Sequence, residues 1–158
     1  MTKVGYSSDM KETYLIVEPA DFRALITDIL KANAAASGPL VVALTGELGA
    51  GKTAFTQELG KLLGITDSIT SPTFTIMKQY ELTHDQYDEL FHIDAYRIEH
   101  EDELRPLRIQ ELFEKTRAII VVEWPEHIST IMPRSAISLI IKIMPENKRE
   151  VVVRKTNK

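Results

Sequence analysis

One glycine-rich segment of the chain has the residue types and the spacing of a phosphate-binding loop. It matches the pattern G-x-x-x-x-G-K-[ST] at every fixed position. Its eight residues are Gly46, Glu47, Leu48, Gly49, Ala50, Gly51, Lys52 and Thr53. Glycines let the backbone curl so that successive N–H groups point at phosphate oxygens, and a helix beginning at Lys52 adds its positive end. We expect Lys52 to reach the β- and γ-phosphates and the Thr53 hydroxyl to complete a Mg²⁺ shell.

A Mg²⁺ site of this kind also needs a carboxylate at the end of a second buried strand. Two candidates follow apolar runs, Glu123 after 118–122 and Asp94 after 90–93. We favour Glu123 as the Mg²⁺ carboxylate because its strand is the more apolar. Asp94 is expected to orient the attacking water or a switch loop, or else to cap the turn before Tyr96.

Other side chains near these motifs have weaker signals. Thr73 lies where nucleotide switches often place a hydroxyl that senses the γ-phosphate, although turn capping is an equally ordinary role. His92 shares a strand face with Asp94, and a lone histidine there is more often structural. Trp124, the only tryptophan, belongs either to the core or to the mouth of the site. For Arg97 and Arg105, the sequence does not decide between ion pairs and a partner surface.

The elements that must position these residues follow from hydrophobic patterning. Residues 40–44 (LVVAL) are a continuous apolar run, as in a strand buried on both faces of a parallel sheet, and 52–63 is predicted to be a helix. A second helix begins at Pro19, and its apolar stripe repeats at helical spacing. The stripe comprises Phe22, Leu25, Ile26, Ile29 and Leu30.

The remaining segments complete the predicted sheet. Strands are expected at 13–17 and 73–80, and a weak helical pattern spans 99–117. Residues 136–144 and 150–154 form a C-terminal hairpin around a turn at 145–148. The predicted fold is α/β, a P-loop NTPase-like mixed sheet, mostly parallel, flanked by helices, with an antiparallel C-terminal edge hairpin. We expect a flexible N-terminal tail over 1–12 and a single P-loop ATPase domain over 13–158.

Composition narrows the possible functions. The 158 residues are 44% hydrophobic and 27% charged, as in an ordinary globular domain. Cysteine is absent, which excludes disulfides, iron–sulfur clusters and thiol nucleophiles. The net charge of −4 argues against a large direct grip on nucleic acid. We expect a cytoplasmic protein that has no membrane segment and no DNA partner.

Four segments in series resemble one known family. They read GELGAGKT at 46–53, SPTF at 71–74, HIDAYR at 92–97 and EWP at 123–125. Each segment alone has modest specificity, but their order and spacing together are highly specific. The chain is similar, over roughly residues 40–154, to the bacterial tRNA threonylcarbamoyladenosine biosynthesis ATPases, the TsaE/YjeE family.

The resemblance implies more than the residues do by themselves. It implies a weak ATP hydrolase that binds ATP, ADP and Mg²⁺ and supports N6-threonylcarbamoyladenosine formation at position 37 of tRNA. Its expected partner is a TsaB–TsaD-like heterodimer, so that tRNA is reached indirectly. Carried onto this chain, Lys52 contacts the phosphates, Thr53 and Glu123 hold Mg²⁺, Asp94 lies in the catalytic switch region, Trp124 lies beside the site, and Arg149 approaches the nucleotide.

Some positions depart from the family pattern. Gln57-Glu58 stands where an Arg-Gly pair is usual, Arg108 replaces a common glycine, and Phe22 aligns with a threonine near the adenine. The adenine contacts are therefore the least defined part of the predicted site. Two other functions stay open, a stand-alone small-molecule kinase and a nucleotide-binding switch. A guanine-reading switch is disfavoured, because residues 147–150 (NKRE) only poorly match N-K-x-D.

Overall fold

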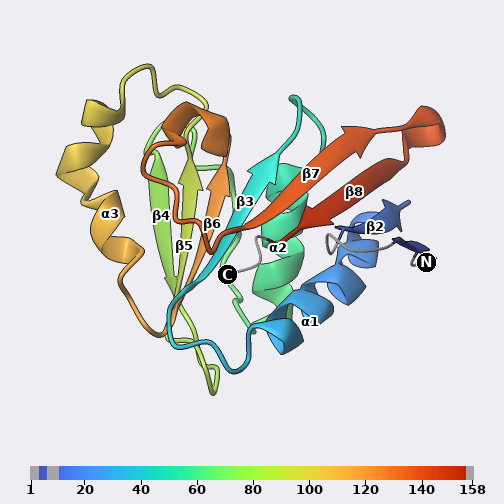
Figure 1. Cartoon of the computed structure of the whole chain (residues 1–158), viewed down its shortest axis with the longest axis horizontal. Coiled ribbons are helices and arrows are strands. Elements are labelled where there is room, and N and C mark those ends of the chain that lie inside the picture. The colour runs from blue at the N-terminus through green and yellow to red at the C-terminus, as the bar shows by residue number, and fades with distance from the viewer. Residues whose placement is uncertain (1–3, 7–10, 156–158) are drawn as a thin grey trace.

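The computed structural model describes residues 4–6 and 11–155, which contain a single eight-stranded sheet (Figure 1). The strand order is β1-β2-β8-β7-β3-β6-β5-β4. In chain order the strands are β1 Val4–Tyr6, β2 Lys11–Ile16, β3 Leu40–Thr45, β4 Met77–Glu81, β5 Glu89–Asp94, β6 Ala118–Glu123, β7 Ile137–Ile143 and β8 Arg149–Arg154.

The middle of the sheet is parallel and both sides are antiparallel. Strand β3 pairs in parallel with β6 and β7, and β5 pairs in parallel with β6. Strand β4 is antiparallel to β5, and β8 is antiparallel to both β7 and β2. The predicted mixed α/β sheet is confirmed, and so is the antiparallel C-terminal hairpin. Its predicted place at the edge is wrong, since β2 pairs along the whole of β8 and β1 continues the sheet beyond it.

The N-terminal segment takes part in this extension of the sheet. A flexible tail is predicted for residues 1–12, and within it β1 and the first two residues of β2 lie in the sheet. Residues 1–3 and 7–10 lie outside the described residues.

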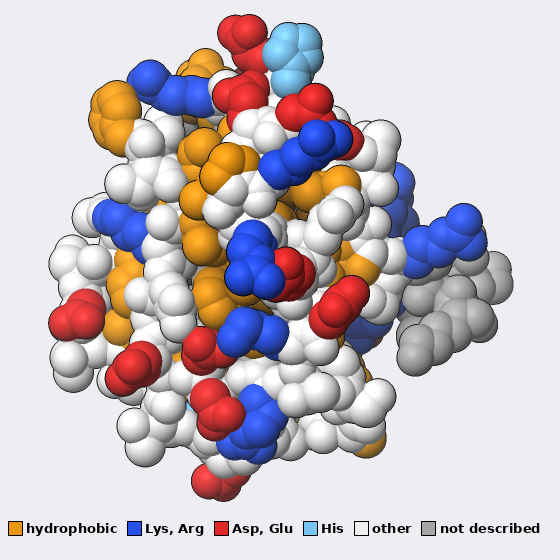
Figure 2. All heavy atoms as spheres, turned by 90° about the vertical axis from the view of Figure 1, so that its left-hand side faces the viewer, with side chains coloured by type: hydrophobic (Ala, Val, Ile, Leu, Met, Phe, Trp, Pro, Cys, Tyr) orange, Lys and Arg blue, Asp and Glu red, His pale blue; other side chains and the backbone are white. Residues whose placement is uncertain are grey.

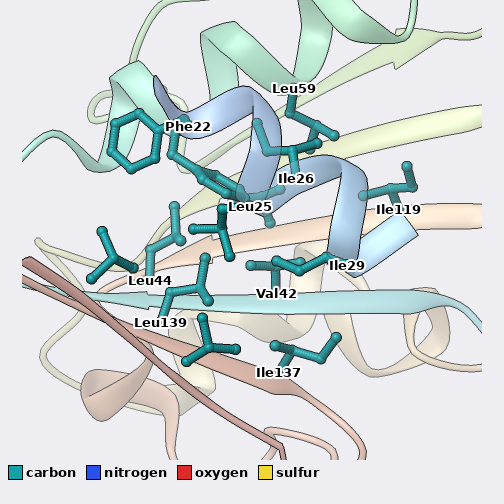
Figure 3. Close-up of a cluster of buried hydrophobic side chains, with 14 of the residues drawn as sticks. Phe22, Leu25, Ile26, Ile29, Val42, Leu44, Leu59, Ile119, Ile137 and Leu139 are labelled. Atoms are coloured by element: carbon teal, nitrogen blue, oxygen red, sulfur yellow. The ribbon is translucent and has the colours of Figure 1, made fainter. Parts of the chain in front are cut away.

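Two helices of eleven residues cover one face of the sheet (Figure 1). They are α1 (Phe22–Ala32), which follows the short 3-10 helix Pro19–Asp21, and α2 (Lys52–Leu62). The predicted stripe of α1 packs on inward side chains of β3, β6 and β7 (Figure 3). The labelled part of this core comprises Phe22, Leu25, Ile26, Ile29, Val42, Leu44, Leu59, Ile119, Ile137 and Leu139. It anchors both ends of the phosphate-loop segment, because β3 precedes that segment and α2 follows it.

The opposite face has a thinner cover. The predicted helix over 99–117 is present only as a 3-10 helix (Glu101–Leu107) and one turn of α-helix, α3 (Ile109–Leu112). Arg108 separates them with a left-handed backbone, φ 52°. Left-handed positions at helix ends favour glycine, so a helix does not continue through this residue. This face mixes acidic and basic side chains around apolar ones (Figure 2).

The strand predicted over 73–80 begins later than expected. Residues 73–75 form a turn, Ile76 has φ 65°, and β4 begins at Met77. The prediction was wrong over 73–76 because Ile76 leaves the extended conformation. The consequence is a loop at residues 70–76, rich in Ser and Thr and called the hydroxyl loop below, next to the end of β5.

Two more 3-10 helices, Pro125–Ile128 and Pro145–Asn147, complete the described elements. Over residues 4–6 and 11–155, no helix has the length and apolar character needed to cross a membrane.

Candidate functional site

The glycine-rich segment connects β3 to α2 as a tight loop. Gly49 has φ 79° and Gly51 has φ 109°, which side chains other than glycine rarely adopt. A Cβ on Gly46 would lie 2.7 Å from the backbone oxygen of Ile141. The loop therefore needs its glycines for backbone shape at two positions and for close packing at the third. Helix α2 begins at Lys52, as the sequence predicts.

Lys52 is almost completely buried beneath this loop, with 6% of the residue exposed. Its Nζ donates to the backbone oxygens of Gly46 at 2.5 Å and Glu47 at 2.9 Å. It also lies 4.3 Å from the ring centroid of Trp124. Burial lowers the pKa of Lys52, although nearby carboxylates, led by Glu123, oppose the shift. The ammonium is thus held inside the loop, where a bound phosphate would lie.

Glu123 lies at the end of β6, directly against the start of the loop. Strands β3 and β6 place Leu44 beside Glu123 in register. The Thr53 hydroxyl, at the start of α2, donates to Glu123 Oε1 at 3.0 Å. The structure therefore brings together the two residues predicted to hold Mg²⁺.

Asp94 is the neighbour of Glu123 on the adjacent strand. Its Oδ2 accepts hydrogen bonds from Ser71 at 2.9 Å and from Thr73 at 3.1 Å. Its Oδ1 accepts from the backbone N–H of Tyr96 at 2.9 Å. One carboxylate therefore caps the turn after β5 and also holds the hydroxyl loop.

Trp124 lies at the mouth of the loop rather than in the centre of the core. Its backbone is left-handed, φ 58°, and its N–H donates to the Leu44 oxygen at 3.2 Å. Tyr96 and His127 pack against the indole with ring centroids 5.0 and 5.7 Å away. The three rings form an aromatic cluster in which Trp124, next to Lys52, is partly buried and Tyr96 and His127 are exposed.

Arg149, the first residue of β8, lies on the other side of the loop. Its guanidinium donates to the backbone oxygens of Ala50 at 3.1 Å and Gly49 at 3.2 Å. It also lines a hollow of about 140 Å³ next to Gly51. Phe22, the position that departs from the family pattern, lines the same hollow.

The structure also gives the contacts of Arg97 and Arg105, whose roles the sequence does not decide. Arg97 packs over the ring of Phe74 in the hydroxyl loop, 4.6 Å from its centroid. Arg105 forms an exposed ion pair with Asp102 at 2.9 Å. Sequence reasoning gave no site role to Ser71, Tyr96 or His127. Only Ser71 had a usable signal, as part of the hydroxyl-rich motif at 71–74.

The oxygen atoms of Thr53 and Glu123 suit Mg²⁺ better than a transition metal. No group of three or more His, Cys, Asp or Glu residues capable of holding a metal occurs in the described part of the chain. Mg²⁺ is usually held by one or two carboxylates together with substrate phosphates and water. A hydroxyl and a carboxylate oxygen 3.0 Å apart, next to a phosphate loop, fit that requirement.

Comparisons with known proteins give a consistent result. The family model "Threonylcarbamoyl adenosine biosynthesis protein TsaE" matches residues 16–151. The chain is 38% identical to the tRNA threonylcarbamoyladenosine biosynthesis protein TsaE of Bacillus subtilis over 136 residues, covering 85% of this chain and 80% of that protein. It is 33% identical to the protein of the same name from Rickettsia typhi, covering 89% and 90%.

A solved structure also matches the whole fold. The crystal structure of Bacillus subtilis YdiB superposes with a TM-score of 0.69 and 30% sequence identity, covering 96% of this chain and 90% of that one. The phosphate loop, the paired Thr53 and Glu123 and the matching family model agree: the chain belongs to the TsaE family of threonylcarbamoyl adenosine biosynthesis proteins.

Proposed function

We propose that the chain is a Mg²⁺-dependent P-loop ATPase that supports N6-threonylcarbamoyladenosine formation at position 37 of tRNA. The observation that carries the proposal is the contact of Thr53 with Glu123 at the base of a complete phosphate loop. A loop without a ligand would gain nothing from the buried lysine, because burying an ammonium costs solvation free energy.

The roles of the site residues follow from their positions. Backbone N–H groups of 46–53 bind the phosphates, and Lys52 moves its hydrogen bonds from the loop carbonyls to phosphate oxygens. Thr53 and Glu123 hold Mg²⁺, which when bound neutralises charge on the phosphates. Asp94 orients the hydroxyl loop through Ser71 and Thr73, so that the loop closes over the terminal phosphate.

The base of the nucleotide is proposed to be adenine, lying in the hollow between Phe22 and Arg149. The poor N-K-x-D match at 147–150 supports adenine over guanine. These residues belong to a 3-10 turn and to β8, which runs antiparallel to β7. They follow β7, which is parallel to β3, but the last two of them already belong to the antiparallel strand β8.

The proposed partner is a TsaB–TsaD-like heterodimer, which would bring the tRNA. Relatives at 38% and 33% identity are named tRNA threonylcarbamoyladenosine biosynthesis proteins. A net charge of −4 suits a protein that reaches tRNA through a partner and not by its own phosphate contacts.

The test is reconstitution with the heterodimer, tRNA, threonine, bicarbonate and ATP. We expect ATP hydrolysis that rises when the heterodimer is present, and threonylcarbamoyladenosine in the recovered tRNA. Lys52→Ala should abolish both, since the phosphates lose their only buried cation from the loop. Modified tRNA in the presence of Lys52→Ala, or no ATP binding by the wild-type chain, would overturn the proposal.

A stand-alone kinase is the alternative, and it would need arginines free to close on the transferred phosphate. Arg105 is instead paired with Asp102 at 2.9 Å, and Arg108 with Glu111 at 2.7 Å. A screen for transfer of labelled phosphate to small metabolites separates the two functions. Transfer without the heterodimer would favour the kinase.

A further inference from the structure

The Glu123 carboxylate has a second hydrogen-bonding partner, on β5, which the phosphate loop does not supply. His92 Nε2 lies 2.8 Å from Glu123 Oε1, the same oxygen that accepts from Thr53 at 3.0 Å. Strand pairing sets His92 beside Val121, two residues before Glu123, so His92 and Glu123 share one face of the sheet. The imidazole therefore approaches the carboxylate from the buried side, opposite the loop.

The two ring nitrogens of His92 have different surroundings. An ionised carboxylate only accepts hydrogen bonds, so Nε2 must carry the proton that is shared with Glu123. The other ring nitrogen, Nδ1, is buried and has no hydrogen-bonding partner among the described residues.

Burying the His92 imidazole in the core costs free energy. The residue is fully buried, and its neighbours on the same face include Leu90 and Val121, which are apolar. Burying a polar ring with one unsatisfied nitrogen costs free energy that an apolar side chain of similar size would avoid. A function at Glu123 explains why the position is not simply apolar.

We propose that His92 is a positioning residue that holds the Glu123 carboxylate in the orientation needed to bind Mg²⁺. The inference rests on the proposed function, because it assumes that Glu123 serves the metal. Ligating carboxylates are commonly fixed by hydrogen bonds from residues behind them, and loss of such a partner typically weakens metal binding about 10- to 100-fold. His92 supplies that bond from a rigid strand in the parallel centre of the sheet.

The experiment measures ADP affinity by calorimetry, once in excess Mg²⁺ and once in EDTA. The ratio of the two dissociation constants is the Mg²⁺ effect. We expect His92→Leu to reduce this effect about tenfold or more while the affinity in EDTA stays unchanged. His92→Gln, whose amide donates near the position of Nε2, should keep the effect within about twofold. Phe91→Leu, on the same strand but the opposite face, is the matched control for loss of core packing and should leave the effect intact.

A double-mutant cycle shows whether His92 acts through Glu123. In a Glu123→Gln background, His92→Leu should cause no further loss of the Mg²⁺ effect. If His92→Leu does not fold, His92→Asn replaces it, because its shorter amide stops short of Glu123. In that case Asn should lose the effect and Gln should retain it.

Several results would overturn the inference. They are an unchanged Mg²⁺ effect in His92→Leu, equal effects in the Asn and Gln variants, an affinity in EDTA that falls as much as the affinity in Mg²⁺, or an equal loss in the Phe91→Leu control. An additive loss in the Glu123→Gln background would show that His92 acts elsewhere. A wild-type chain that does not bind ADP, or binds it without any Mg²⁺ effect, would overturn the proposed function first, and this inference with it.

Discussion

Two glutamates are buried to nearly the same extent but have very different surroundings. Glu58, on α2, is 2% exposed, and Glu123, at the end of β6, is 3% exposed. Glu58 forms ion pairs with Arg23 at 2.8 Å and with Lys61 at 2.6 Å. Glu123 instead accepts hydrogen bonds from a hydroxyl and an imidazole, on Thr53 and His92.

The difference is consistent with the proposed roles of the two carboxylates, structural for Glu58 and Mg²⁺-binding for Glu123. Burial raises the pKa of Glu58, but hydrogen bonds from Lys61 and Arg23 outweigh it and bring the pKa below its usual value. Its charge is already balanced by two cations. Glu123 is held in place by a hydroxyl and an imidazole and forms no direct ion pair with Lys or Arg among the described residues. Among the described residues, hydrogen bonds from a hydroxyl and an imidazole in place of direct ion pairs with Lys or Arg thus distinguish Glu123 from Glu58.

The largest expected effect comes from Glu123→Gln. Gln keeps the shape and an acceptor oxygen but removes the charge, so binding of Mg²⁺ to the phosphates is weakened. We expect the kcat of ATP hydrolysis with the heterodimer to fall about 100- to 1000-fold. The free energy of unfolding should change by less than about 1 kcal/mol, as measured by urea denaturation. A variant that keeps its kcat would remove the distinction between the two glutamates.

Glu58→Gln should show the opposite pattern. It breaks two charge-assisted hydrogen bonds and should lower the free energy of unfolding by about 1–3 kcal/mol. Because Arg23 and Lys61 are half exposed, water solvates them after the change and limits the loss. Mg²⁺-dependent ADP affinity, measured below the melting temperature, should match that of the wild type. Loss of this affinity would place Glu58 in the site.

The stabilisation by Glu58 should depend on pH. The folded pKa lies below the unfolded value of about 4.3, so the folded state binds fewer protons near that pH. The stabilisation is complete above the unfolded pKa and is lost as pH falls through the folded pKa. The difference in unfolding free energy between wild type and Glu58→Gln should therefore shrink from pH 7 to pH 3. A difference that grows with acid would contradict the ion-pair account.

Arg23→Met should have the smallest effect. Arg23 is half exposed, and Lys61 still pairs with Glu58 after the substitution. We expect a loss of less than about 1 kcal/mol in urea denaturation, with nucleotide binding unchanged. A larger loss would mean that the two cations act together and not independently.

The glycine-rich loop between β3 and α2 and the central strands could be predicted because their signals are local. Residues 46–53 carry a spaced motif, and the apolar runs at 40–44 and 118–122 are long enough to identify buried strands. The break at Arg108 and the late start of β4 could not be predicted in this way, because neither Arg nor Ile favours the left-handed backbone that Arg108 and Ile76 adopt.

The partners of each site residue were harder to predict than the residues themselves. Glu123 and Asp94 end apolar strands and could be found one at a time. The contact of His92 with Glu123 depends on the β5–β6 register, which joins residues 31 positions apart. The Gln57-Glu58 departure from the family pattern had no interpretation in sequence, since Arg23 lies 35 positions from Glu58.

The most direct test of the comparison is tRNA modification with three versions of the chain. Wild type, Glu123→Gln and Glu58→Gln are each combined with the heterodimer, tRNA, threonine, bicarbonate and ATP at a temperature where all three are folded. Threonylcarbamoyladenosine in the tRNA is then measured by mass spectrometry. The account predicts modification with wild type and with Glu58→Gln, and little or none with Glu123→Gln. Full modification with Glu123→Gln would contradict it.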